Sequence, residues 1–133
     1  MKQGYAIELE KRLKDRETLA GRITALVDYN EFVLKESIDT YRNFLEFFNF
    51  SMSSEAFRSE VSAFLSDVSE MIEVQITRKH GRREKAGAIS AAAVTRFILS
   101  ASFGISLQHL LDPKNRDVQA GFDIVKATAV TLL

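Results

Sequence analysis

The sequence predicts an all-α fold, a bundle of five or six helices. Three observations support this prediction. The 133 residues include a single proline and only six glycines, apolar residues recur at intervals of three and four, and the alternation typical of strands is hard to find. Hydrophobic residues make up 46% of the chain, an ordinary share for a folded protein. A chain of this length is expected to form one domain with a real core.

The first predicted helix covers roughly residues 2–14 and carries a narrow apolar stripe. We expect Asp15 to cap the next helix, because a short carboxylate accepts the free backbone N–H groups of a first turn. The helical apolar spacing then continues through residues 19–48. A break near residues 35–37, with Ser37 as a new cap, would divide this stretch into two helices. Periodicity does not choose between one helix and two.

A polar, serine-rich stretch over residues 49–54 is expected to end this region. Ser54 followed by Glu55 has the pattern of an N-cap with an acid in the first turn, which the helix dipole favours. The helix beginning there has one apolar face and is expected to end in cations followed by Gly81. The basic cluster at this end consists of Arg78, Lys79, Arg82, Arg83 and Lys85. We interpret it as a helix-capping group, and the alternative is a nucleic-acid-binding patch.

The helix predicted over residues 91–111 is apolar around most of its circumference. Ser90 is its expected N-cap, and Asp112-Pro113 ends it. A helix of this kind must be covered on more than one side, and its small residues would let another helix approach closely. The narrow polar strip along it consists of Thr95, Ser102, Ser106 and His109.

The last predicted helix, about residues 115–133, is also more apolar than a one-sided surface helix. Two such helices predict that two copies of the chain pair across a two-fold axis to form an intermolecular four-helix bundle. The alternative is that the helix at 91–111 is the centre of a monomeric core. The residues expected at the interface between the copies are Phe97, Gly104, Leu107, Leu111, Phe122, Val125 and Ala129.

Motifs of catalysis and metal binding are missing from the sequence. There is no cysteine, which excludes disulfides, thiolate chemistry and cysteine-based metal sites. His80 and His109 do not form a metal-binding pattern with other ligands, and the patterns of a nucleophile elbow, a dinucleotide fold and a phosphate loop do not occur. We therefore expect no enzyme activity, no cofactor and no metal.

Charge and hydropathy predict a cytoplasmic protein without membrane contact. The 18 basic and 18 acidic residues give a formal charge of zero, which argues against nucleic-acid binding by bulk electrostatics. The N-terminus becomes charged before an apolar stretch develops, unlike a signal peptide. The longest uncharged run, residues 97–111, is shorter than the ~20 residues that a spanning helix needs.

Seven of the ten phenylalanines lie between residues 32 and 64. They could form a bulky core, or they could form the wall of a small-molecule pocket between helices. The sequence does not choose between these two interpretations. The residues that we expect to line such a pocket, taken from several helices, are Tyr29, Tyr41, Phe44, Phe48, Phe64, Met71 and Phe97.

Residues 97–113 read FILSASFGISLQHLLDP. This run resembles the penultimate-helix signature of the tetracycline-repressor (TetR) family of bacterial transcriptional regulators. The shared features are a helix rich in small residues that leads to a glycine, an apolar-x-apolar-Gln run, two leucines and Asp-Pro. The order of the helices upstream and the connection at Gly81 are similar too, so the resemblance covers essentially the whole chain.

The resemblance implies that residues 1–133 are a ligand-binding and dimerisation domain. In this family the last two long helices form the dimer interface and an effector binds among the middle helices. Ligand occupancy moves the DNA-reading domains. We therefore expect a homodimer with a mostly apolar or aromatic small-molecule effector. The alternative is a helical homodimeric interaction module without a ligand, in which the phenylalanines are solid core.

The DNA-binding part of such a regulator has no counterpart in these residues. Regulators of this family begin with a helix-turn-helix domain, and no such segment precedes the first predicted helix. DNA contacts are therefore expected only through a domain absent from this chain. Such a chain would be an excised domain, a proteolytic fragment or the product of a misassigned start.

Overall fold

The computed structural model describes residues 2–36, 38–77 and 89–132, and these residues form helices and no strands. The predicted all-α class is therefore confirmed. Of the two interpretations left open for residues 19–48, the structure has two helices, and Ser37 itself lies outside the described residues. In chain order the helices are α1 (Lys2–Leu13), α2 (Leu19–Glu36), α3 (Ile38–Ser51), α4 (Glu55–Thr77), α5 (Ala91–Leu111), α6 (Arg116–Gln119) and α7 (Gly121–Leu132).

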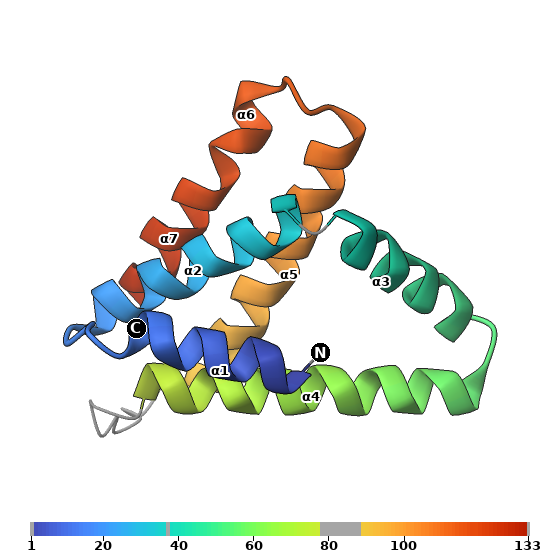
Figure 1. Cartoon of the computed structure of the whole chain (residues 1–133), viewed down its shortest axis with the longest axis horizontal. Helices are drawn as coiled ribbons and strands as arrows, with labels where there is room; N and C mark the ends of the chain where they lie inside the picture. Colours follow the sequence, from blue (N-terminus) through green and yellow to red (C-terminus); the bar gives the residue numbers. More distant parts are fainter. Residues whose placement is uncertain (1, 37, 78–88, 133) are drawn as a thin grey trace.

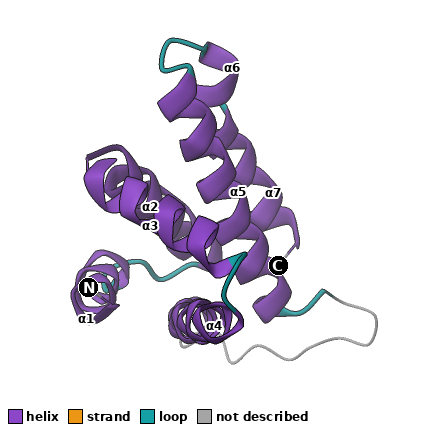
Figure 2. Ribbon diagram, turned by 90° about the vertical axis from the view of Figure 1, so that its right-hand side faces the viewer, coloured by secondary structure: helices purple, strands orange, loops and turns teal. Residues whose placement is uncertain are grey.

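Helix α2 is the central element of the bundle (Figure 1). It packs against α1 and α4, and also against α5 and α7. Helices α5 and α7 run side by side (Figure 2). Helix α3 leaves this bundle, and its end lies next to the start of α4. The two helices therefore form two sides of a wedge (Figure 1).

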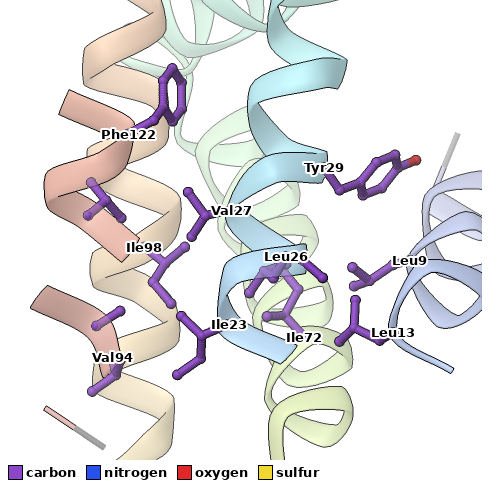
Figure 3. Packing of buried hydrophobic residues seen from close by; sticks show 13 residues of the cluster. Leu9, Leu13, Ile23, Leu26, Val27, Tyr29, Ile72, Val94, Ile98 and Phe122 are labelled. Atoms are coloured by element: carbon purple, nitrogen blue, oxygen red, sulfur yellow. The ribbon is translucent and has the colours of Figure 1, made fainter. Parts of the chain in front are cut away.

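The hydrophobic core is built on two sides of α2 (Figure 3). Leu26 points toward α1, where Leu9 and Leu13 lie, and Val27 points toward Ile98 of α5. All five side chains are fully buried or nearly so. Full burial of a side chain of this size stabilises a fold by about 1.5–3 kcal/mol. The apolar residues at helical spacing along α2 therefore contact α1 on one side of the helix and α5 on the other.

Two of the predicted helix caps are confirmed. The hydroxyl of Ser54 accepts the backbone N–H of Phe57 at 3.3 Å, and that of Ser90 accepts the N–H of Ala93 at 3.1 Å. Each serine satisfies a donor that has no partner within its helix. The starts of α4 and α5 are therefore determined by local sequence.

The predicted cap at Asp15 is wrong. The chain first makes a turn, closed by a 3.0 Å hydrogen bond from the N–H of Arg16 to the carbonyl of Leu13. Helix α2 begins only after this turn, and the hydroxyl of Thr18 accepts the N–H of Gly21 at 3.0 Å. The turn reverses the chain so that α2 packs on α1, which moves the start of α2 beyond the reach of Asp15.

A buried arginine joins the ends of three helices. Arg22, near the start of α2, is only 2% exposed. Its Nε donates to the carbonyl of Gln75 in α4 at 2.6 Å, and its Nη1 donates to the carbonyl of Leu13 in α1 at 2.9 Å. Carbonyls in the last turn of a helix lack intrahelical partners and carry the negative end of the helix dipole. The guanidinium of Arg22 supplies hydrogen-bond donors and a positive charge to the last turns of both α1 and α4.

The last predicted helix is divided at Ala120, which separates α6 from α7. Ala120 keeps right-handed helical angles, with φ −66° and ψ −16°. Gly121 follows directly, and a Cβ at this position would lie 3.0 Å from the side chain of Ile105 in α5. The glycine therefore permits the close approach of α7 to α5.

Three residues that were predicted to lie between two copies of the chain lie instead in its own core. Phe122, Val125 and Ala129 are 1%, 4% and 0% exposed and belong to the cluster around α2. Their assignment to a dimer interface is wrong, because α2 covers the face of α7 that carries them. Helical periodicity identifies an apolar face but not the element that covers it.

The polar strip of α5 also faces inward. Thr95, Ser102 and Ser106 are buried, and His109 is half-buried. The Thr95 hydroxyl donates to the carbonyl of Ala91 at 2.8 Å, whereas the hydroxyls of the two serines and Nδ1 of His109 have no hydrogen-bond partner among the described residues. Small size rather than polarity explains the two serines, because they let α5 lie close to its neighbours.

Of the described helices, α5 is the one long and apolar enough to cross a membrane by length and composition. A core helix of a soluble bundle meets the same criterion, and α5 packs against α2, α4 and α7. One third of its most apolar stretch is buried within the chain. The remainder of α5 offers an apolar face to the outside.

Candidate functional site

The candidate site is a pocket of about 200 Å³ between α3 and α4. Engineered apolar cavities of roughly 150 Å³ take up benzene, so this volume suits a molecule with one ring. Five of the seven lining side chains are phenylalanines. The lining residues are Phe44, Phe47 and Phe48 from α3 and Phe57, Glu60, Val61 and Phe64 from α4.

Helical spacing places these side chains on facing surfaces. On α4 the lining residues recur at steps of three and four from Phe57 to Phe64, which is one face of a helix. On α3 they recur at the same steps from Phe44. The two faces meet because α4 starts at the Ser54 cap just after α3 ends. The pocket is therefore formed by two helices that are adjacent in the chain.

Ring contacts between lining residues join the two helices. The ring of Phe47 stacks on that of Phe57 with centroids 5.3 Å apart, and the rings of Phe44 and Phe64 lie 5.7 Å apart. Phe50 adds an edge contact to Phe57 at 5.0 Å. Such pairs contribute about 0.5–1.5 kcal/mol each beyond their buried area. The walls of the pocket are therefore ordered by contacts with one another.

The pocket is connected to α5 through Phe103. Its ring makes edge contacts with Phe44 at 5.9 Å and Phe48 at 5.5 Å, and both of these line the pocket. The hydroxyl of Tyr41 donates to the carbonyl of Phe103 at 2.7 Å. Burial raises the pKa of the Tyr41 phenol above its ordinary value, which already keeps the hydroxyl protonated at neutral pH. The inner end of α3 is thereby fastened to α5.

Three of the seven predicted pocket residues line this pocket, namely Phe44, Phe48 and Phe64. Tyr29 does not: it is buried near α1, where the guanidinium of Arg12 lies 4.7 Å from its ring centroid. Burial also raises the pKa of Tyr29, and the nearby Glu8 adds to this effect. Tyr29 therefore belongs to the hydrophobic core and not to the pocket.

The other predicted residues that are absent from the pocket lining are Tyr41, Met71 and Phe97. Tyr41 is buried in its contact with Phe103. Met71 shares the helix face of Phe64 but lies seven residues further along α4, which is about 10 Å. Phe97 lies on the outward side of α5 and is 37% exposed. The aromatic or sulfur-containing character of a side chain therefore does not show by itself that the residue lines the pocket.

Four lining residues were missed, namely Phe47, Phe57, Glu60 and Val61. Each lies three or four positions from another lining residue on its own helix. Extending the wheel from Phe64 toward the start of α4 would have found Phe57 and Val61. The charged Glu60 would still have been overlooked, because a search for an apolar lining discards carboxylates.

A second surface lies on the outer side of α5, and we call it the outward α5 stripe. All of its residues are exposed and none carries a charge. A Cβ at Gly104, in the middle of the stripe, would meet nothing within 4 Å. The four α5 residues predicted at a dimer interface all belong to the stripe, which consists of Ala93, Phe97, Ser100, Gly104, Leu107 and Leu111.

The part of the chain that the structure describes has no candidate metal site. No three His, Asp or Glu side chains there come together in a group that could hold a metal ion. The basic cluster at residues 78–85 lies outside the described residues, so neither interpretation of it is tested. The pocket and the outward α5 stripe are therefore the two candidate sites. Comparison with known protein families, curated proteins and solved structures finds no match to this chain.

Proposed function

We propose that this chain is the ligand-binding and dimerisation domain of a transcriptional regulator similar to the TetR family. It takes up a small apolar or aromatic molecule between α3 and α4, and it pairs with a second copy through the outward α5 stripe. The observation that carries this proposal is that the phenylalanine pocket and the stripe are separate surfaces joined through α5. DNA contacts belong to a domain outside these residues.

The pocket supports the ligand part of the proposal. Phenylalanine rings from two helices line about 200 Å³, and an apolar molecule entering this space is partly removed from water. A molecule with one ring fits the volume. Typical pockets for drug-sized molecules have roughly 300–1,000 Å³. The smaller volume of this pocket favours the alternative, a module without a ligand.

The outward α5 stripe supports the pairing part. Ile98 and Phe122 face α2 (Figure 3). Helical spacing puts the exposed residues of the stripe on the side of α5 opposite to Ile98. On the neighbouring α7, Ile124 and Val130 are exposed as well. An uncharged face with a glycine at its middle suits a close crossing with the same face of a second copy. Pairing of α5 and α7 in this way forms a four-helix bundle.

Phe103 supplies a route between the two surfaces. It touches two pocket residues and directly precedes Gly104 of the stripe. If a ligand shifts Phe44 or Phe48, the contact with α5 changes. Coupling of this kind is reciprocal, so a ligand that strengthens pairing binds more tightly to the pair.

Replacing Gly104 with leucine is expected to raise the dissociation constant of the dimer by roughly five- to 150-fold. A leucine at a close helix crossing is overpacked, which typically costs about 1–3 kcal/mol. The fold of the single chain should be preserved, because the space around Gly104 is open. Sedimentation velocity measured over a range of concentrations gives the constant.

Ala92→Leu is the matched control for this variant, because Ala92 is exposed on the same helix but outside the stripe. It should leave the dissociation constant within about twofold. An unchanged dimer in Gly104→Leu would place the interface elsewhere. A wild-type chain that sediments as a monomer at every concentration would reject pairing altogether.

Toluene is expected to stabilise the protein, and Val61→Phe is expected to abolish this effect by filling the pocket. A ligand present at one hundred times its dissociation constant raises the free energy of unfolding by about 2.7 kcal/mol. Val74→Phe is the control, since Val74 is exposed on α4 and is not among the lining residues. Thermal unfolding with and without toluene measures the effect. Absence of any stabilisation would favour the alternative, an interaction module whose phenylalanines are solid core.

A further inference from the structure

We propose that the pocket between α3 and α4 selects a cation, namely a small aromatic ammonium ion whose charge lies at Glu60 and whose ring lies among the phenylalanines. This inference rests on the ligand-binding part of the proposed function and adds the charge of the ligand.

Glu60 is the one charged side chain among the seven that line the pocket. It lies three residues after Phe57 and four before Phe64, on the pocket-facing side of α4. It makes no hydrogen bond or ion pair with another described residue. Because Glu60 is exposed, a cation beside its carboxylate can keep part of its hydration. The carboxylate is therefore available to a ligand at the edge of the pocket.

The two arginines of α3 and α4 and Arg96 of α5 make other contacts. The guanidinium of Arg42 lies 3.8 Å from the carboxylate of Asp39. Arg58 donates to the carbonyls of Ser51 and Met52 at 3.3 Å, at the junction of α3 and α4. Arg96 of α5 donates to the hydroxyl of Ser66 at 3.0 Å. None of these guanidinium groups lies among the groups that line the pocket. A cationic ligand would therefore meet an unneutralised carboxylate.

The α3–α4 segment is strongly acidic although the whole chain is neutral. Residues 38–77 contain seven acidic side chains but only two arginines and no lysine, so their formal charge is −5. The whole chain has a formal charge of zero. Clustered charge of one sign raises the local concentration of the opposite ion and its rate of association. This segment therefore favours cations over neutral molecules and anions.

The phenylalanine rings reinforce this preference. The face of an aromatic ring carries partial negative charge and attracts a cation within about 6 Å of its centroid, and aromatic cages are the usual recognition device for quaternary ammonium groups. Five such rings line the pocket, whose volume of about 200 Å³ accepts one ring with its substituent. A phenyl group can fill the apolar interior while its ammonium group remains beside Glu60.

The test compares phenyltrimethylammonium with tert-butylbenzene, its uncharged counterpart of the same shape. Isothermal titration calorimetry on the whole chain is expected to show about tenfold tighter binding of the cation. Glu60→Gln should remove most of this difference without changing the affinity for tert-butylbenzene. Glu70→Gln is the control, because Glu70 is exposed on α4 and does not line the pocket. It should leave the affinity for the cation within about twofold.

Each contrary result has a distinct meaning. Equal affinities for the two compounds would overturn the selection of a cation while leaving the pocket of the proposed function in place. Absence of binding by both compounds would overturn this inference and the ligand part of the proposed function together. Equal losses in Glu60→Gln and Glu70→Gln would show that the field of the whole segment acts and that Glu60 has no special role, which would also overturn the inference.

Discussion

Phe122→Ala is expected to lower the free energy of unfolding by about 3–5 kcal/mol. The ring of Phe122 is 1% exposed and packs in the cluster around α2. Its removal takes away buried area and leaves a cavity between α2, α5 and α7, because a packed bundle collapses only in part around a missing side chain. Chemical denaturation at two protein concentrations measures the loss and separates it from any effect on pairing.

Ile124→Ala is the matched control. Ile124 lies two residues from Phe122 on the same helix but is 62% exposed. Its replacement should change the stability of the single chain by less than about 0.5 kcal/mol. If Phe122→Ala kept the stability of the single chain and only weakened self-association, Phe122 would lie between two copies, as its position in the sequence predicts.

Arg22→Ala is expected to lower the free energy of unfolding by about 3 kcal/mol. The substitution leaves the carbonyl of Gln75 without the donor that it has at 2.6 Å, and the carbonyl of Leu13 loses a donor at 2.9 Å and keeps the N–H of Arg16. Each buried polar group that loses its partner costs about 1–3 kcal/mol. Helices α1 and α4 also lose the positive charge near their last turns. Urea denaturation monitored by circular dichroism gives the difference.

Two further variants sharpen this test. Arg22→Met keeps the packing of the side-chain stem and should be destabilised nearly as much, because the hydrogen bonds rather than the stem join the helices. Arg58→Ala removes an arginine that also donates to two carbonyls, at 3.3 Å but at an exposed position. It should cost less than about 1 kcal/mol. An equal loss in Arg22→Ala and Arg58→Ala would contradict the role assigned to burial.

The sequence indicated that phenylalanines could form the candidate site, but it did not show which residues line it. The density of phenylalanines indicated either a pocket or a core, and Phe44, Phe48 and Phe64 line the pocket. Tyr29 was assigned to it and lies instead on the side of α2 that faces α1 (Figure 3). Residues on the same chain segment can face different neighbours, and the crossing of the helices decides which of them share a space.

Local sequence determined the helices and two of their starts. Apolar spacing specified the all-α class and the helix at 91–111, and the serine hydroxyls at positions 54 and 90 capped α4 and α5. These features depend on residues within one or two turns, so they can be read from the sequence. Tertiary packing alone decided that Arg22 is buried and that Phe122 faces α2. The reason is that burial depends on which element covers a face, and the covering element comes from a distant part of the chain.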